Sequence, residues 1–119
     1  MEIEKVSFGK IVINGKEYGD VIIIANKVFE RDRSVANKEF GTSHRIATKE
    51  INMLKSGNPD IIIIGTGIYG ALEVTKEDIA KLEETGVKVI VKYTKEAADE
   101  VNKFLKAGKK VNALLHSTC

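Results

Sequence analysis

The sequence predicts an α/β fold: a single compact domain with a parallel βαβαβ unit and additional amino-terminal strands that form a mixed or second small sheet. Three observations predict this fold. A hairpin pattern occupies the start of the chain, strand and helix patterns alternate over the second half, and the length of 119 residues suits one domain. No linker, repeat or low-complexity segment divides the chain, so residues 1–119 are expected to form that single domain.

The first third of the chain is expected to consist of strands. Residues 11–18 place alternating isoleucines before Asn14-Gly15, which fits a hairpin closed by a two-residue turn that needs positive φ. The β-branched run at residues 21–24 fits a buried strand. Residues 26–48 are crowded with charges and long for a loop, so a functional loop or one or two irregular strands are expected there.

The remaining chain alternates between helix and strand. Three helices are expected, capped by Thr48, Thr75 and Thr94 and ended by Gly57, Gly86 and Gly108. Strands are expected at Ile61–Ile64, Val87–Val91 and Val111–Leu115. The four consecutive isoleucines indicate a strand covered on both faces. This order predicts parallel pairing of the three strands with right-handed crossovers.

Composition narrows the functional classes. The chain has 19 basic and 17 acidic residues, a net charge of +2 that does not favour a polyanionic partner. Lysines gather between Lys88 and Lys110, but no aromatic platform accompanies them, so nucleic-acid binding is not expected. One cysteine excludes an intrachain disulfide, and no signal peptide or membrane span is evident, so a cytoplasmic, soluble protein without membrane insertion is expected.

The candidate site lies where the parallel strands end. Segments that follow parallel strands emerge at one edge of the sheet, which is where open α/β sheets bind ligands. Gly65, Thr66 and Gly67 follow one strand, Thr94 the next and His116 the last. Arg31, Arg33 and His44 are candidates for a basic wall that binds anions, together with Arg45 of the same charged segment. Surface ion pairs are the favoured interpretation of these charges.

Three motifs suggest chemistry that their context does not favour. Gly65–Gly70 reads G-x-G-x-x-G after a strand, but the helix cap comes too late and no ribose-binding acid follows, so no nicotinamide or flavin cofactor is expected. His44, His116 and Cys119 lack metal-ligand spacing, so no metal is expected. Cys119 is either a nucleophile or a structural thiol. We expect residues 117–119 to pack against the glycine loop, the Cys119 thiol to be shielded, and His116 to form hydrogen bonds inside the domain.

The chain also resembles a known family. The resemblance rests on Gly15–Tyr18, on His44 followed by Ile46, on Ile64–Gly67, and on a carboxy-terminal pattern made of Tyr93–Ala97, Val101–Leu105, Gly108–Val111 and Leu115–Cys119. The family consists of small domains of uncharacterised function, and it includes the mammalian adipogenesis-associated protein and a mitochondrial respiratory complex I assembly factor. It implies a compact α/β fold and no agreed reaction or catalytic residues. Members often carry a tryptophan ahead of the matching histidine, where this chain has Phe40.

Two functional hypotheses follow, and neither establishes whether the protein is an enzyme. The first is a non-enzymatic accessory or assembly-type domain that binds another protein, as the resemblance implies. The alternative is a binding protein or enzyme for a small anionic or phosphate-containing molecule, which would use the rim of Gly65–Gly67, Thr94 and His116. Self-association stays open. A dense, enclosed polar cluster at the rim would favour the alternative.

Overall fold

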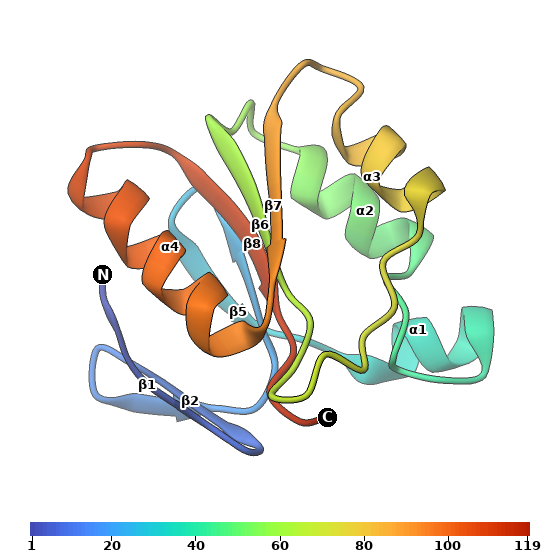
Figure 1. Ribbon diagram of the computed structural model, residues 1–119, viewed down its shortest axis with the longest axis horizontal. Coiled ribbons are helices and arrows are strands. Elements are labelled where there is room, and N and C mark those ends of the chain that lie inside the picture. Colours follow the sequence, from blue (N-terminus) through green and yellow to red (C-terminus); the bar gives the residue numbers. More distant parts are fainter.

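The chain forms two β-sheets, a small amino-terminal one and a central one covered by helices. The computed structural model describes all residues 1–119 (Figure 1). Strands β1 (Ile3–Ser7), β2 (Lys10–Ile13) and β3 (Lys16–Tyr18) form the small antiparallel sheet in the order β1-β2-β3. The β2–β3 turn has positive φ at both Asn14 (50°) and Gly15 (79°), which confirms the predicted hairpin.

The central sheet is mixed and has five strands in the order β5-β4-β8-β6-β7. Its strands are β4 (Val21–Ile24), β5 (Lys27–Glu30), β6 (Ile61–Gly65), β7 (Lys88–Lys92) and β8 (Val111–Leu115). Strand β6 pairs in parallel with both β7 and β8, which confirms the predicted βαβαβ unit. Strand β4 is antiparallel to β8 and to β5, so the amino-terminal strands extend one edge of this sheet as well as forming the small sheet.

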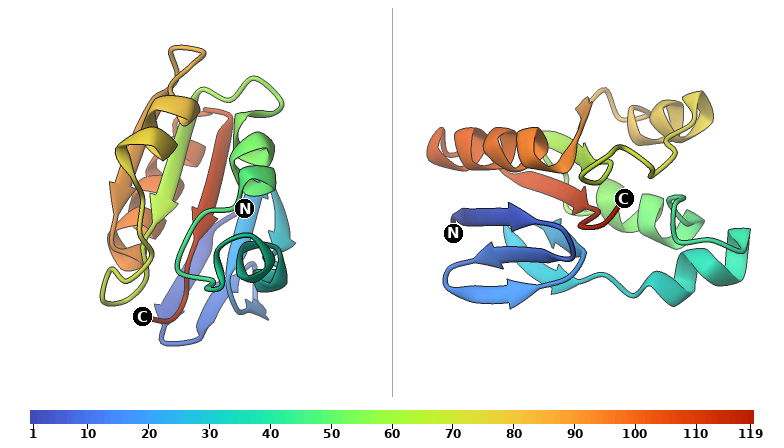
Figure 2. Two further views of the ribbon diagram at one scale, coloured as in Figure 1. Left: turned by 90° about the vertical axis from the view of Figure 1, so that its right-hand side faces the viewer. Right: turned by 60° about the horizontal axis from the view of Figure 1, so that its bottom comes forward.

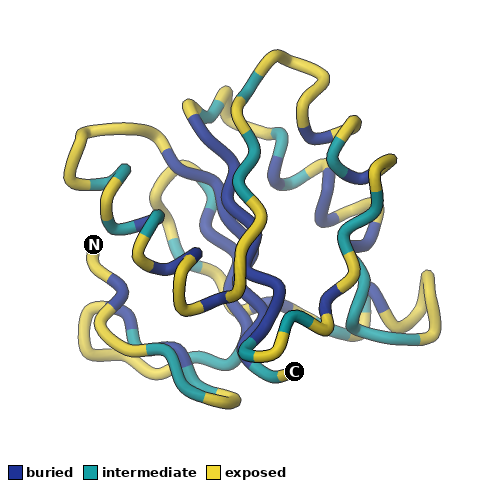
Figure 3. Tube along the Cα trace, viewed as in Figure 1, coloured by how far each residue is buried: buried dark blue, intermediate teal, exposed yellow.

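Alternate residues of the central strands enter two separate cores. Ile61 and Ile63 face a core shared with the small sheet and with α4 (Thr94–Lys106), and both views in Figure 2 show helices flanking the sheet. Ile62 and Ile64 face the opposite core, built with α2 (Thr48–Lys55) and α3 (Lys76–Leu82). The four-isoleucine strand is therefore buried on both faces, as predicted, and appears dark blue in Figure 3.

The charged segment 26–48 folds differently from the prediction. It contains one regular strand, β5, and a helix, α1 (Arg33–Phe40), where a loop or irregular strands were expected. Asp32 caps α1 by accepting from the backbone N–H of Ser34, and Gly41 ends it in the left-handed region. Only Ala36 of α1 is buried, so the helix has no apolar stripe that the sequence could have revealed.

Two of the three predicted threonine caps are wrong by one residue. Thr75 caps α3, and its side chain and that of Asp78 form the predicted capping box. Thr48 and Thr94, in contrast, are the first helical residues, and Ala47 and Tyr93 occupy the capping positions. Both threonine hydroxyls have other partners, since Thr48 bonds to Glu39 and Thr94 to the carbonyl of His116. No helix has the length and apolar composition needed to cross a membrane.

Candidate functional site

The carboxyl ends of the parallel strands meet as predicted. The His116 backbone N–H donates to the Gly65 carbonyl at 3.0 Å. The Thr94 hydroxyl joins the same two segments, because it accepts from the Gly67 N–H at 2.8 Å and donates to the His116 carbonyl at 2.5 Å. The structure thus brings Gly65, Gly67, Thr94 and His116 together, with Thr94 and His116 fully buried.

The carboxy-terminal tail, residues 117–119, fills the glycine loop. The Thr118 carbonyl accepts from Ile68 N–H at 2.7 Å, and the Cys119 carbonyl accepts from the N–H groups of Tyr69 and Ala71 at 2.9 Å each. Gly67 permits this approach, since its φ is 109° and a Cβ there would lie 2.5 Å from the Cys119 carbonyl carbon. The loop N–H groups that a dinucleotide pyrophosphate would need are thus bonded to the chain itself.

The Cys119 thiol is exposed, so the predicted shielding is wrong. Cys119 is held through its backbone carbonyl, and this arrangement leaves its side chain free to face solvent. His116 does form hydrogen bonds inside the domain, as expected.

A buried carboxylate, which sequence reasoning missed, organises the residues next to the tail. Asp20 lies between β3 and β4 and receives six hydrogen bonds. Oδ1 accepts from Arg33 Nη2 (2.8 Å) and from the backbone N–H (2.7 Å) and hydroxyl (2.8 Å) of Ser117. Oδ2 accepts from Arg31 Nη1 (3.1 Å), Arg33 Nε (3.1 Å) and His116 Nδ1 (2.9 Å). The only sequence signal was an acid directly before a buried strand.

Arg31 connects this carboxylate to helix α2. Its guanidinium donates to both oxygens of Glu50, at 2.6 and 3.1 Å, and to the carbonyls of Ser43 and Arg45. Burial lowers the pKa of Arg31, but the hydrogen bonds and charge of Glu50 and Asp20 outweigh burial and raise it overall. The Arg31 side chain is fully buried and bonded to two carboxylates, so it is not available to an external anion. It forms ion pairs, as the favoured interpretation expected, but these lie inside the domain and not at its surface.

Electrostatics hold Asp20 in its ionised form. Burial alone raises the pKa of Asp20, but hydrogen bonds from His116, Arg33 and the Ser117 backbone lower that pKa far below its usual range. An ionised Asp20 requires a proton on His116 Nδ1. In a neutral ring, His116 Nε2 then accepts from the Thr118 hydroxyl, 3.3 Å away.

The Asp20–His116–Thr118 arrangement follows the order of an acid–base–nucleophile triad. The Thr118 hydroxyl also accepts from Arg33 Nη2 at 3.0 Å, and the His44 ring meets the His116 ring edge-on at 5.2 Å between centroids. However, none of the four cavities of the molecule is lined by Thr118 or His116. Nor does any group of three or more His, Cys, Asp and Glu side chains have the arrangement of a metal site. The hydrogen bonds of the cluster fix the tail in place.

Exposed aromatic side chains surround the tail, and sequence reasoning missed them too. Phe8 of the β1–β2 turn, Tyr69 of the glycine loop and Tyr93 before α4 are 57%, 72% and 54% exposed, and we call these three residues the aromatic surface. The rings of Phe8 and Tyr69 lie 6.4 Å apart, and the Tyr93 ring packs on Gly70. A hollow of about 370 Å³ adjoins this surface, lined by Thr66, Val91, Lys92, Tyr93 and Glu96.

Comparisons with known proteins agree with this fold over the whole chain. A conserved hypothetical protein from Pyrococcus horikoshii OT3 is 36% identical, with full coverage of both chains and a TM-score of 0.85. A solved protein named MT938 is 31% identical over 99% of this chain and 98% of its own, with a TM-score of 0.82. An outer membrane protein from Bartonella henselae shares the fold at 19% identity, with a TM-score of 0.76 over 98% of this chain and 94% of its own. The model of a protein family of unknown function, DUF498/DUF598, matches residues 3–116. The chain therefore belongs to the DUF498/DUF598 family.

Proposed function

We propose that this chain acts as one non-enzymatic accessory domain, and that it binds another protein through the aromatic surface. The observation that carries this proposal is the clustering of Phe8, Tyr69 and Tyr93, all more than half exposed, at one edge of the molecule. Exposed apolar clusters of this kind mark interaction sites, and tyrosine is enriched among the residues that dominate binding energy.

The backbone beneath the aromatic surface is anchored. Tyr69 N–H donates to the Cys119 carbonyl, and Gly9 N–H beside Phe8 donates to the Ser117 carbonyl at 2.8 Å. Ser117 in turn bonds twice to Asp20, which links the aromatic surface to the buried cluster. Because a backbone that is already anchored loses less conformational freedom on binding, such a surface binds a partner at lower entropic cost. The hollow beside Tyr93 and Val91 suits one anchoring side chain of that partner.

The sequence resemblance supports the same role. A complex I assembly factor and the adipogenesis-associated protein belong to the family that the chain resembles, and assembly is a function of transient protein binding. The contacts described here would then serve to hold the binding surface rigid, and the Asp20–His116–Thr118 arrangement would need no substrate.

Affinity capture from a lysate, quantified by mass spectrometry, tests this role. Tyr69→Ser combined with Tyr93→Ser is expected to reduce recovery of the specific partner by at least about tenfold, as for interface residues of high energy. Phe29→Ser serves as the matched control, since Phe29 is 49% exposed on β5, outside the aromatic surface. Equal partner recovery by both variants would contradict the proposal. A concentration-dependent dimer that dissociates only in the tyrosine variant would identify the partner as a second copy of the chain.

The alternative, a small anionic ligand at the rim, is favoured by one feature: the polar cluster is dense and enclosed. Its polar groups already bond to one another, so a ligand would have to accept from the exposed side of Arg33, whose side chain is 36% exposed. A thermal-shift screen of nucleotides, phosphates and metal ions tests this alternative. A rise of several degrees that Arg33→Gln abolishes would favour the ligand over the protein partner.

A further inference from the structure

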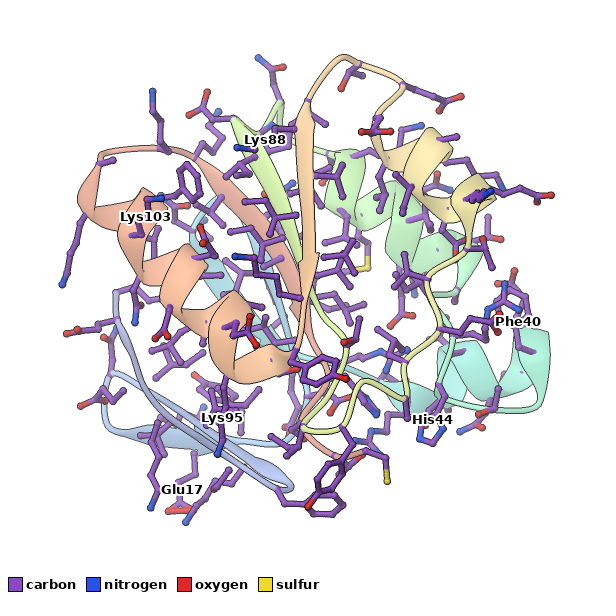
Figure 4. The ribbon with its side chains drawn as sticks, viewed as in Figure 1. Glu17, Phe40, His44, Lys88, Lys95 and Lys103 are labelled. Atoms are coloured by element: carbon purple, nitrogen blue, oxygen red, sulfur yellow. The ribbon has the colours of Figure 1, made fainter.

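The largest cavity of the molecule, about 440 Å³, lies between α1, α2 and α3 and shares no lining residue with the aromatic surface. Phe40, at the end of α1 (Figure 4), and Arg45, in the segment after it, both line the cavity. Thr48 of α2 and Lys76 and Lys81 of α3 line it as well. Sites for small molecules typically occupy about 300–1,000 Å³, so the cavity has a suitable size.

Arg45 is the unusual residue of this cavity. Its guanidinium carbon lies 4.2 Å from the centroid of the Phe40 ring, so the guanidinium is held by cation–π contact. The Arg45 Nε is shut off from solvent and has no hydrogen-bond partner. The nearest carboxylate oxygen, on the exposed Glu73, is 3.9 Å from this nitrogen, which is too far for a hydrogen bond. Arg31, in contrast, bonds to two carboxylates, whereas the Arg45 side chain is 25% exposed and its guanidinium donates no hydrogen bond within the chain, so its Nη groups keep donors that a ligand can reach.

The charges that line the cavity balance, but two of its carboxylates are bonded within the chain whereas its cations are not. Three cations line it, Arg45, Lys76 and Lys81, and neither lysine forms an ion pair. Three carboxylates also line it, but two are engaged within the chain. Glu39 accepts from the backbone N–H and the hydroxyl of Thr48 at 2.8 and 2.6 Å, and Asp78 accepts from the N–H of Thr75 at 3.1 Å. Glu77 is the remaining carboxylate. All three carboxylates keep their charge, so the lining is neutral overall, and Arg45, Lys76 and Lys81 are the cations with hydrogen-bond donors left for a ligand.

The pKa of Glu39 shows that these cations act on a carboxylate at the cavity wall. The hydrogen bonds from Thr48 lower the pKa of Glu39 most, and the charges of Lys81 and Arg45 lower it further. A carboxylate at this wall is thus stabilised by the two cations.

We propose that this cavity binds a small organic anion whose phosphate or carboxylate group accepts hydrogen bonds from Arg45. A planar guanidinium stacked on an aromatic ring keeps its edge donors free, and their fork matches the oxygens of a phosphate or carboxylate. Lys76 and Lys81 add positive charge, and the Thr48 and Thr75 side chains offer polar contacts for the rest of the ligand. This site is independent of the proposed protein-binding role.

Titration of the full chain by ¹H–¹⁵N NMR tests the site, with glycerol 3-phosphate and succinate as probes and glycerol as the uncharged control. Either anion is expected to shift the amide signals of Ile46, Thr48 and Lys76 saturably, while glycerol leaves them unchanged. Arg45→Gln is expected to weaken binding by at least about tenfold, as for the loss of a charge-assisted hydrogen bond. Lys49→Gln removes one positive charge on α2 outside this cavity and is expected to leave affinity within about twofold.

Several results would overturn the site. These are the absence of saturable shifts with both anions, shifts that map to other regions, or equal weakening by Arg45→Gln and Lys49→Gln. A native-like spectrum of the free Arg45→Gln variant shows that lost binding does not reflect lost folding, and Arg45→Lys, which keeps the charge without the planar fork, is expected to restore binding only in part. Partner recovery in the capture experiment is expected to be the same for Arg45→Gln and the native chain, so failure of the anion site and failure of the protein-binding role are distinguishable.

Discussion

Substitution of Gly67 by alanine tests whether the tail is bound in the glycine loop. A Cβ at position 67 would lie 2.5 and 2.6 Å from the carbonyl carbon and oxygen of Cys119, and 2.9 Å from the Thr118 carbonyl oxygen. These atoms are backbone, so relief requires the tail or the loop to move. The positive φ of 109° adds strain that any side chain would feel.

Gly86→Ala is the matched control, because its φ is 81° and a Cβ there would meet no atom within 4 Å. Backbone strain alone costs about 1–2 kcal/mol in the left-handed region, and both variants bear a cost of this kind. Gly67→Ala also disrupts three hydrogen bonds from the N–H groups of Ile68, Tyr69 and Ala71 to the tail. At about 0.5–1.5 kcal/mol each, these bonds predict that Gly67→Ala loses about 2–4 kcal/mol more than the control.

Urea unfolding of both variants measures the difference in the free energy of unfolding, and hydrogen exchange of the three loop amides locates it. Exchange at Ile68, Tyr69 and Ala71 is expected to accelerate in Gly67→Ala and to stay at the native rate in Gly86→Ala. Equal destabilisation by the two variants, with loop amides still protected in Gly67→Ala, would refute the packing of the tail against the loop.

Three further predictions concern the cluster and the tail. Asp20→Asn replaces one carboxylate oxygen by an NH₂ group that faces three hydrogen-bond donors. One of these donors can become an acceptor and two stay unpaired, so the free energy of unfolding measured in urea is expected to fall by about 2–5 kcal/mol. Glu17→Gln, which breaks an exposed pair with Lys10, is expected to cost less than about 1 kcal/mol, and equal losses would contradict the buried network. Because the folded-state pKa of Asp20 is depressed, its stabilisation is present above the unfolded pKa of about 3.9 and is lost as pH falls below it. As the pH is lowered below about 4, the urea concentration at the unfolding midpoint is therefore expected to decrease, and to decrease less steeply in Asp20→Asn than in the native chain. Parallel curves of midpoint against pH for the two proteins would exclude Asp20 as a source of the pH dependence. Iodoacetamide is expected to label the exposed Cys119 in the native protein nearly as fast as in a denatured control, and native labelling about tenfold slower would show that the thiol is covered.

The fold was largely predictable because its signals are local. The isoleucine strand β6, the Asn14-Gly15 turn and the Thr75–Asp78 capping box each depend on neighbouring residues, and each forms as expected. Helix α1 escaped prediction because it buries a single alanine, so its sequence has no apolar periodicity. The sequence did not predict that Thr48 and Thr94 are the first helical residues and not the caps, because their hydroxyls bond to groups outside their own helices.

The candidate site was predictable only in part. Parallel pairing places Gly65, Thr94 and His116 at one rim whatever their side chains do, and the structure confirms this placement. Asp20 was missed because its donors are up to 97 residues away, a pairing that only tertiary structure creates. The exposure of Phe8, Tyr69 and Tyr93 was missed for a related reason, since burial depends on neighbours that sequence spacing does not reveal.

Site-specific photo-crosslinking tests the central claim, binding of a protein through the aromatic surface, most directly. A photoreactive phenylalanine analogue placed at position 69 would lie at the centre of that surface, and the same analogue at position 29 would lie on β5 outside it. A discrete adduct of defined mass is expected from position 69 and none from position 29. Adducts of equal yield from both positions, or an adduct from position 29 alone, would contradict the proposed binding surface.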